Sequence, residues 1–188
     1  YILKEQSIFR LMLLKFFRTG IFAPLLLLLP AYTVEALDAG AGVGTGMMIT
    51  MGIGGVTATF AMSSWGFFAK KGLVCLLTLL SGSVVITVLG LSNWIWLSVP
   101  IMVIMGLSQS HFIVANQTLV QNIVPDTLRG RVSSVWHYEQ GLIPLFSLVI
   151  GLSASMIGIS HVMTIYGVMA IIIGIVCLIR FKDIRSLD

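Results

Sequence analysis

The residues with the clearest capacity for chemistry lie in the run VWHYEQGLIP, which carries His137, Glu139 and Gln140. Imidazole and carboxylate groups bind and release protons, and an amide can hydrogen-bond a small molecule. Glu139 follows Arg131 by eight residues, or about 12 Å along a helix at ~1.5 Å per residue. An ionisable group at that depth in an apolar segment predicts a functional role, so Glu139 is our candidate for proton coupling. The alternative is a carboxylate near the membrane interface, hydrated or paired with a base such as Arg18.

A second set of polar residues lies in the preceding segment, SQSHFIVANQTLVQN, and a third lies around residue 50. Ser110, Gln117 and Gln121 share one helical face by spacings of seven and four, as do Thr50 and Thr57 by a spacing of seven. An unpaired polar group in hydrocarbon costs several kcal/mol, so these side chains need either water in a cavity or a neighbouring helix. Both interpretations stay open. The candidates for lining a substrate cavity are Thr50, Thr57, Ser110, Gln117, Gln121, His137 and Gln140.

The sequence does not contain the motifs that would indicate an enzyme. Its three Gly-Leu-Ser triplets do not continue to the glycine of an intramembrane serine protease, and His-Glu-x-x-His is absent. The phosphate-binding Gly-x-x-x-x-Gly-Lys-Ser/Thr loop is absent as well. No cysteine and histidine cluster has metal-ligand spacing. We therefore expect no catalysis, no cofactor and no metal site.

The composition places most of this chain in lipid. Of 188 residues, 57% are hydrophobic and only 10% are charged, and the mean hydropathy is +1.04. A soluble domain has about 25% charged residues because its surface faces water. The net charge of +4 is therefore no sign of nucleic-acid binding, and the positions of the charges matter more than their sum.

Six apolar windows are long enough to cross a bilayer, since a helix needs about 20 residues to span ~30 Å of hydrocarbon. A β-barrel would require alternating segments, whereas these runs are uniformly apolar. The sequence predicts an all-α membrane protein with a cytoplasmic linker at 1–14 and a cytoplasmic tail at 180–188. The predicted spans are 15–34, 43–68, 73–91, 96–120, 132–157 and 162–179.

All eleven lysines and arginines fall at or before the first span, after the last span, or in alternate loops on one side. The loops on the other side carry only Glu35 and Asp38. By the positive-inside rule, both termini are cytoplasmic. From charge alone, Arg129 and Arg131 in the loop NIVPDTLRGRV have a topological role.

The run VPDTLRGRVSSVW, followed by GLIPLFSLVIGL, resembles the loop between helices ten and eleven, and helix eleven, of major facilitator superfamily transporters. The similarity is greatest to the prokaryotic exporters that include the enterobactin exporter and macrolide efflux proteins, and LLPAYTVEAL resembles the end of their helix seven. The resemblance implies that the chain is the C-terminal half of a twelve-helix protein of a prokaryotic inner or plasma membrane. An N-terminal six-helix half would then be its partner.

The resemblance also implies a cytoplasmic gating role for Asp126, Arg129 and Arg131, because in the family this loop changes partners as the two halves rock. One loop departs from the family pattern. WGFFAKKG holds Lys70 and Lys71 but lacks the acidic residue that helps to close the cytoplasmic side. A symmetric closure by the two loops is therefore not expected here.

Together these features predict a secondary active transporter that exports a small molecule by alternating access, with proton coupling. The substrate would lie between the two halves, near the middle of the membrane. The polar spans are expected to line this cavity, whereas 73–91 and 162–179, which carry no charge, suit a lipid-facing position. The alternative is a six-helix membrane scaffold or a channel subunit without coupling, although neither a filter nor a ring of like charges is present.

Overall fold

The computed structural model describes residues 2, 4–65, 70–185 and 187, and throughout these residues its regular structure is helical. Two short 3-10 turns, labelled η1 and η2, lie directly before and after the helix α6. The elements are α1 (Gln6–Leu27), α2 (Leu29–Glu35), α3 (Ala41–Trp65), α4 (Lys71–Leu91), α5 (Ile95–Ile123), η1 (Asp126–Leu128), α6 (Arg129–Tyr138), η2 (Glu139–Leu142), α7 (Ile143–Ile157), α8 (Ile159–Arg180) and α9 (Lys182–Arg185).

The chain is a multi-pass membrane protein by helix length and hydropathy. Within the described residues, five helical segments are long and apolar enough to cross a bilayer, and a sixth is present if the bent pair α1 and α2 forms one span. The prediction of a helical membrane protein is therefore confirmed, with five to six spans. The predicted end of the second span, at 66–68, lies outside the described residues.

The first span differs from the single straight helix expected over 15–34. It begins at Gln6, so most of the segment predicted as a linker is helical, with the apolar residues Ile8, Leu11 and Leu14 buried on one face. The helix then breaks at Leu28, and α2 continues at an angle of 50°. Pro30 lies in the first turn of α2, where the missing proline N–H costs least.

Part of the segment predicted as a cytoplasmic tail folds onto the bundle. The short helix α9 folds against the start of α4, where Ile184 is fully buried. The Gly72 amide donates a hydrogen bond of 3.1 Å to the Leu187 carbonyl, and an added Cβ at Gly72 would meet the Ile184 carbonyl. An ion pair between Arg10 and Asp183 joins α1 to the same helix.

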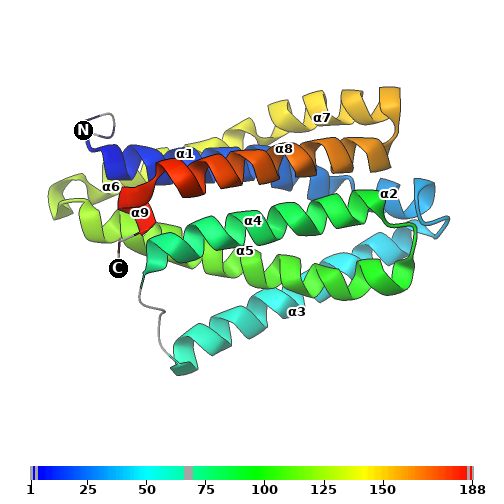
Figure 1. Cartoon of the computed structure of the whole chain (residues 1–188), viewed down its shortest axis with the longest axis horizontal. Helices are drawn as coiled ribbons and strands as arrows, with labels where there is room; N and C mark the ends of the chain where they lie inside the picture. The colour runs from blue at the N-terminus through cyan, green and yellow to red at the C-terminus, as the bar shows by residue number, and fades with distance from the viewer. Residues whose placement is uncertain (1, 3, 66–69, 186, 188) are drawn as a thin grey trace.

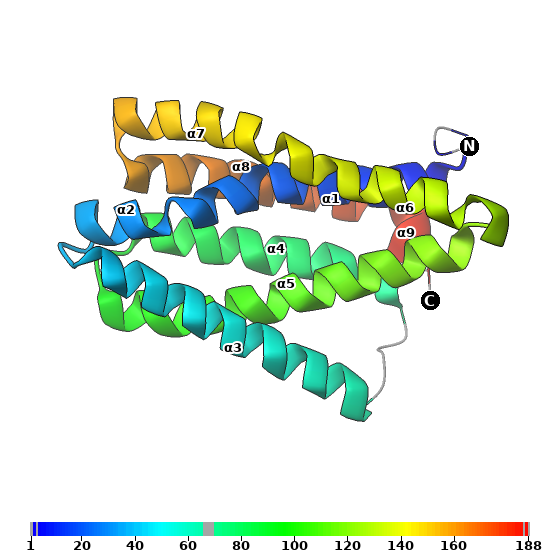
Figure 2. The ribbon, with the colours of Figure 1, turned by 180° about the vertical axis from the view of Figure 1, so that it is seen from behind.

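The long helices run roughly side by side, with α7 at one edge of the bundle and α3 at the other (Figures 1 and 2). Both views place the two chain ends at the same end of the bundle, beside α6 and α9. The starts of α4 and α6 and the end of α8 also lie at this end, which gathers the basic residues Lys71, Arg129 and Arg180 there. Two basic residues, Lys15 and Arg18, lie inside the bundle instead.

The expectation that span 73–91 faces lipid is wrong for much of its surface. The corresponding helix, α4, packs against α5 on one side and α8 on the other, and 50% of its apolar window is buried. Small residues allow the close approach to α8, because an added Cβ at Gly90 would meet Thr164 and one at Gly167 would meet Thr87. A helix without charges is therefore not necessarily peripheral, because apolar side chains suit protein contacts as well as lipid.

Candidate functional site

The candidate site surrounds a local irregularity in the fifth span. Residues Glu139–Leu142 form a 3-10 turn between α6 and α7. Pro144 follows in the first turn of α7, and proline lacks the N–H that a continuous α-helix would need at this position. Such mid-helix 3-10 segments often mark functional hinges. The turn directs the Glu139 side chain toward α1 while His137 and Gln140 remain exposed.

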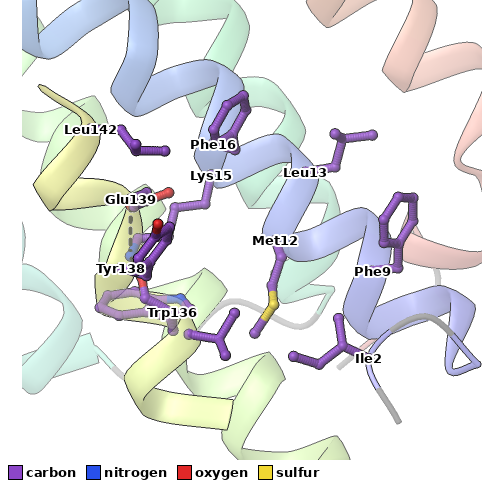
Figure 3. A pocket seen from close by; sticks show the side chains of 11 residues that line it. Ile2, Phe9, Met12, Leu13, Lys15, Phe16, Trp136, Tyr138, Glu139 and Leu142 are labelled. Carbon is purple, nitrogen blue, oxygen red and sulfur yellow. Dashed lines mark hydrogen bonds and ion pairs between the residues drawn. The ribbon is translucent and has the colours of Figure 1, made fainter. Parts of the chain in front are cut away.

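A buried ion pair joins this turn to α1. The Lys15 Nζ atom lies 2.7 Å from the Glu139 carboxylate, and the two side chains are only 7% and 9% exposed. The Thr19 hydroxyl donates a hydrogen bond of 3.0 Å to the same carboxylate. Lys15 also donates to the Trp136 carbonyl and lies 3.0 Å from the centroid of its ring. Figure 3 shows the Lys15 and Glu139 side chains pointing toward one another across the helix contact.

An amide connects this ion pair to α5. Asn116 is fully buried and accepts a hydrogen bond of 3.0 Å from the Trp136 indole. Its own amide nitrogen donates to the Leu11 carbonyl at 3.0 Å. Asn116 therefore links α1, α5 and α6, and it holds the indole against the Lys15 ammonium. Satisfied networks of this kind specify one arrangement of a core, because each member needs its partners.

One turn further along α1, Arg18 lies in an aromatic environment. Its side chain is only 4% exposed. Its Nη1 donates a hydrogen bond of 2.6 Å to the Gln109 side chain. The guanidinium carbon lies 5.0 Å from the Phe22 ring centroid and 4.6 Å from that of Phe112. Arg18 therefore lies inside the bundle, because α1 begins at Gln6, well before it, and neighbouring side chains cover it.

Two cavities border the Lys15 and Glu139 pair. One, of about 300 Å³, is lined mainly by apolar side chains of α1, α6 and η2, including Met12, Phe16 and Leu142 (Figure 3). The other has a volume of about 370 Å³ and a more polar wall. The polar residues that line the second cavity are Lys15, Arg18, Thr19, Gln109, Gln117, Trp136, His137, Glu139 and Gln140.

This second cavity, called the polar cavity below, brings together several residues that the sequence singled out. Gln117, His137, Glu139 and Gln140 all line it, and they come from α5, α6 and η2. Glu139 is buried and His137 is exposed, but the two residues border the same space. These four candidates form one site.

The remaining candidates lie elsewhere. The Thr50 hydroxyl lies within hydrogen-bond distance of the Met47 and Val99 carbonyls, so it contributes to the contact between α3 and α5. Thr57 is exposed and bonds within its own helix. Ser110 borders a separate groove between α3 and α5, and Gln121 borders a small pocket beside α6.

The charged loop lies outside the polar cavity, at the end of the bundle that holds the chain ends (Figure 1). Asp126 and Arg129 form an exposed ion pair of 2.6 Å, and Arg131 is exposed one residue beyond Gly130. Asp126, Arg129 and Arg131 are therefore not among the residues that line the polar cavity.

Lys15, Thr19 and Asn116 were not identified from the sequence as site residues. Counting a span back from Val34 placed Lys15 at the membrane boundary, whereas α1 begins nine residues before it, at Gln6. At 1.5 Å per residue, Lys15 is about 14 Å into the helix. A spacing of four between Lys15 and Thr19 was the available signal, since it places both on one face.

Compared with known protein families and with curated proteins, the sequence matches no family and none of those proteins. The role of this site must therefore be inferred from its residues and their geometry.

Proposed function

We propose that this chain is the C-terminal half of a secondary active transporter of the major facilitator type, and that it exports a small molecule in exchange for protons. The observation that carries the proposal is the buried pair of Lys15 and Glu139 beside the polar cavity. Ionisable residues inside membrane proteins are costly and mark ion or substrate pathways. Both chain ends would face the cytoplasm, where the basic residues gather.

The polar side chains exposed on α6 and η2 support this proposal. Ser133, His137 and Gln140 are exposed on the segment formed by α6 and η2. Lipid cannot hydrogen-bond these groups, so they require water or a second protein surface. A substrate cavity between this bundle and a partner half of six helices would supply both.

The contacts of Glu139 support proton coupling, because this side chain would lose its partners in a second conformation. Glu139 is held by Lys15 and Thr19 in this conformation, and both contacts depend on the position of η2 beside α1. A movement of η2 away from α1 would remove both partners from Glu139 and place the side chain in a different environment. The 3-10 turn and Pro144 provide the place where such a movement can occur. A change of proton affinity between two conformations is what coupling to a gradient requires.

The second candidate function is a membrane scaffold without transport. The close packing of α3 on α5 through glycine favours it, because a backbone contact of this kind is rigid. A scaffold does not account for the buried ion pair beside a cavity. Transport is therefore the better supported function.

The test uses everted membrane vesicles that carry the intact protein and an imposed proton gradient. Labelled erythromycin, 2,3-dihydroxybenzoate and ethidium serve as trial substrates, and accumulation above empty vesicles identifies a transported compound. We expect Glu139→Gln to abolish uphill accumulation while exchange without a gradient continues, because the neutral amide cannot carry a proton. Gradient-driven accumulation that persists in Glu139→Gln would move the coupling site elsewhere, and no accumulation of any compound by the wild type would favour the scaffold.

A further inference from the structure

The guanidinium of Arg18 carries an unused binding edge. Within the described residues, its Nε and Nη2 atoms are buried and have no hydrogen-bond partner, whereas Nη1 is bonded to Gln109. These two nitrogens form one side of the planar group and present parallel N–H bonds. An arginine edge of this shape matches the two oxygens of a carboxylate.

The charge of the polar cavity is also uncompensated. Its lining contains two cations, Lys15 and Arg18, and one carboxylate, Glu139. Lys15 and Glu139 are already paired at 2.7 Å, so the charge of Arg18 is left over. A buried charge without a counter-ion is costly, and an anionic ligand would neutralise it.

The surroundings of Arg18 indicate what else the ligand contains. Phe22 and Phe112, whose rings lie on the guanidinium, also line the cavity, and Ile113 and Ile143 add apolar surface. Gln117 and Gln140 supply amides on the same wall. Aromatic and aliphatic surface beside a single cationic fork suits a planar apolar body with one acidic group. A volume of about 370 Å³ limits that body to small size.

We infer that Arg18 is the anion-binding residue of the polar cavity and that the ligand is a small amphipathic carboxylate, such as an aromatic acid. This inference rests on the proposed function, because it names the class of substrate for the same cavity. Because Nε and Nη2 are buried in this conformation, a rotation of the guanidinium would turn this edge toward the carboxylate, and the Phe22 and Phe112 rings would contact the apolar part. Lys15 remains with Glu139. The substrate and the proton would therefore be bound by different residues, Arg18 and Glu139.

The test is equilibrium binding, which needs no gradient and is therefore independent of coupling. Labelled benzoate is added to the purified full-length protein in detergent, with salicylate, benzamide and benzylammonium as competitors. Benzamide has nearly the shape of benzoate without its charge. We expect salicylate to compete, and benzamide and benzylammonium to bind at least about tenfold more weakly, because they cannot make the charge-assisted pair.

The variants separate a binding role from a folding role. Arg18→Gln should raise the Kd of benzoate about tenfold to a hundredfold, and Arg18→Lys should recover only part of the loss because it keeps the charge without the fork. Arg180→Gln, a change to an exposed arginine at the end of α8, is the matched control and should bind like the wild type. Thermal unfolding shows which variants are folded.

Some results would overturn the inference. These are equal competition by benzamide, unchanged benzoate affinity in folded Arg18→Gln, full affinity in Arg18→Lys, or no saturable binding of either acid by the folded wild type. Failure of gradient-driven transport with binding intact would count against the proposed function alone. Loss of binding with transport of a neutral or cationic compound intact would count against this inference alone.

Discussion

The Lys15 ammonium and the Glu139 carboxylate lie 2.7 Å apart, although 124 positions separate the two residues in the sequence. This ion pair fastens the 3-10 turn η2 to the middle of α1. The Trp136 ring beneath the ammonium and the Thr19 hydroxyl beside the carboxylate complete its surroundings. Because both charges are buried, each depends on the other, and the two helices are coupled through them.

Removal of one member of this pair should destabilise the protein more than removal of both. Lys15→Met leaves the Glu139 carboxylate without its counter-ion, and such a loss costs about 3–5 kcal/mol in buried pairs. The double variant Lys15→Met with Glu139→Gln removes both charges and should recover most of that free energy of unfolding. Thermal and denaturant unfolding of the purified variants measures the difference.

Lys182→Met is the matched control for this experiment, because Lys182 is exposed on α9 and should change stability by no more than about 0.5 kcal/mol. Equal stability of Lys15→Met and the wild type would show that the pair is hydrated rather than buried. A double variant as unstable as Lys15→Met would show that the lysine contributes through packing on Trp136.

The loop pair of Asp126 and Arg129 should affect transport without affecting folding. Both side chains are exposed, and exposed pairs contribute about 0–1 kcal/mol. Arg129→Ala should therefore leave membrane insertion and abundance nearly intact, while the gating role that the family resemblance implies for this loop predicts a fall in transport. Transport assays normalised to protein abundance measure this effect. Unchanged transport would leave the loop with a topological role only.

Water access should distinguish the polar cavity from the outer surface. Cysteine at Gln117 should react with small water-soluble thiol reagents, because Gln117 lines the polar cavity, and the exposed position Gln121 should react as well. Cysteines at Val168 and Ile172, on the apolar outer face of α8, should stay unreactive in membranes. The native thiols, Cys75 and Cys177, are buried and should be replaced first. Equal inertness at all four positions would contradict a wet cavity.

The contact between α3 and α5 should tolerate no side chain at Gly54. An added Cβ there would meet the Val103 carbonyl, whereas Gly52, two residues earlier, has nothing within 4 Å. Gly54→Ala should lower stability by about 1–3 kcal/mol, since overpacking has a cost of that size. Gly52→Ala should be neutral or slightly stabilising, because alanine favours a helix over glycine. Similar melting temperatures for the two variants would argue against close packing.

Hydropathy was sufficient to predict the helical membrane class, because transfer of a segment to lipid depends on its length and composition alone. It was insufficient for the first span. The window counted back from Val34 assumed one straight helix, whereas the chain bends at Leu28 and begins its helix at Gln6. Apolar residues repeating on one face before Lys15 were the sign that the helix starts earlier.

The sequence by itself determined that this chain crosses a membrane several times and that Glu139 lies within a span, since both follow from the order of apolar and charged residues. Only the tertiary structure decided which groups meet. The spacing of residues fixes the face of a helix but not the helix that covers it, so the pairing of Glu139 with Lys15, rather than with Arg18, came from the packing of η2 on α1. The same packing left the Nε and Nη2 edge of Arg18 without a protein partner, because its neighbours are the Phe22 ring of α1, the Phe112 ring of α5 and the single amide of Gln109.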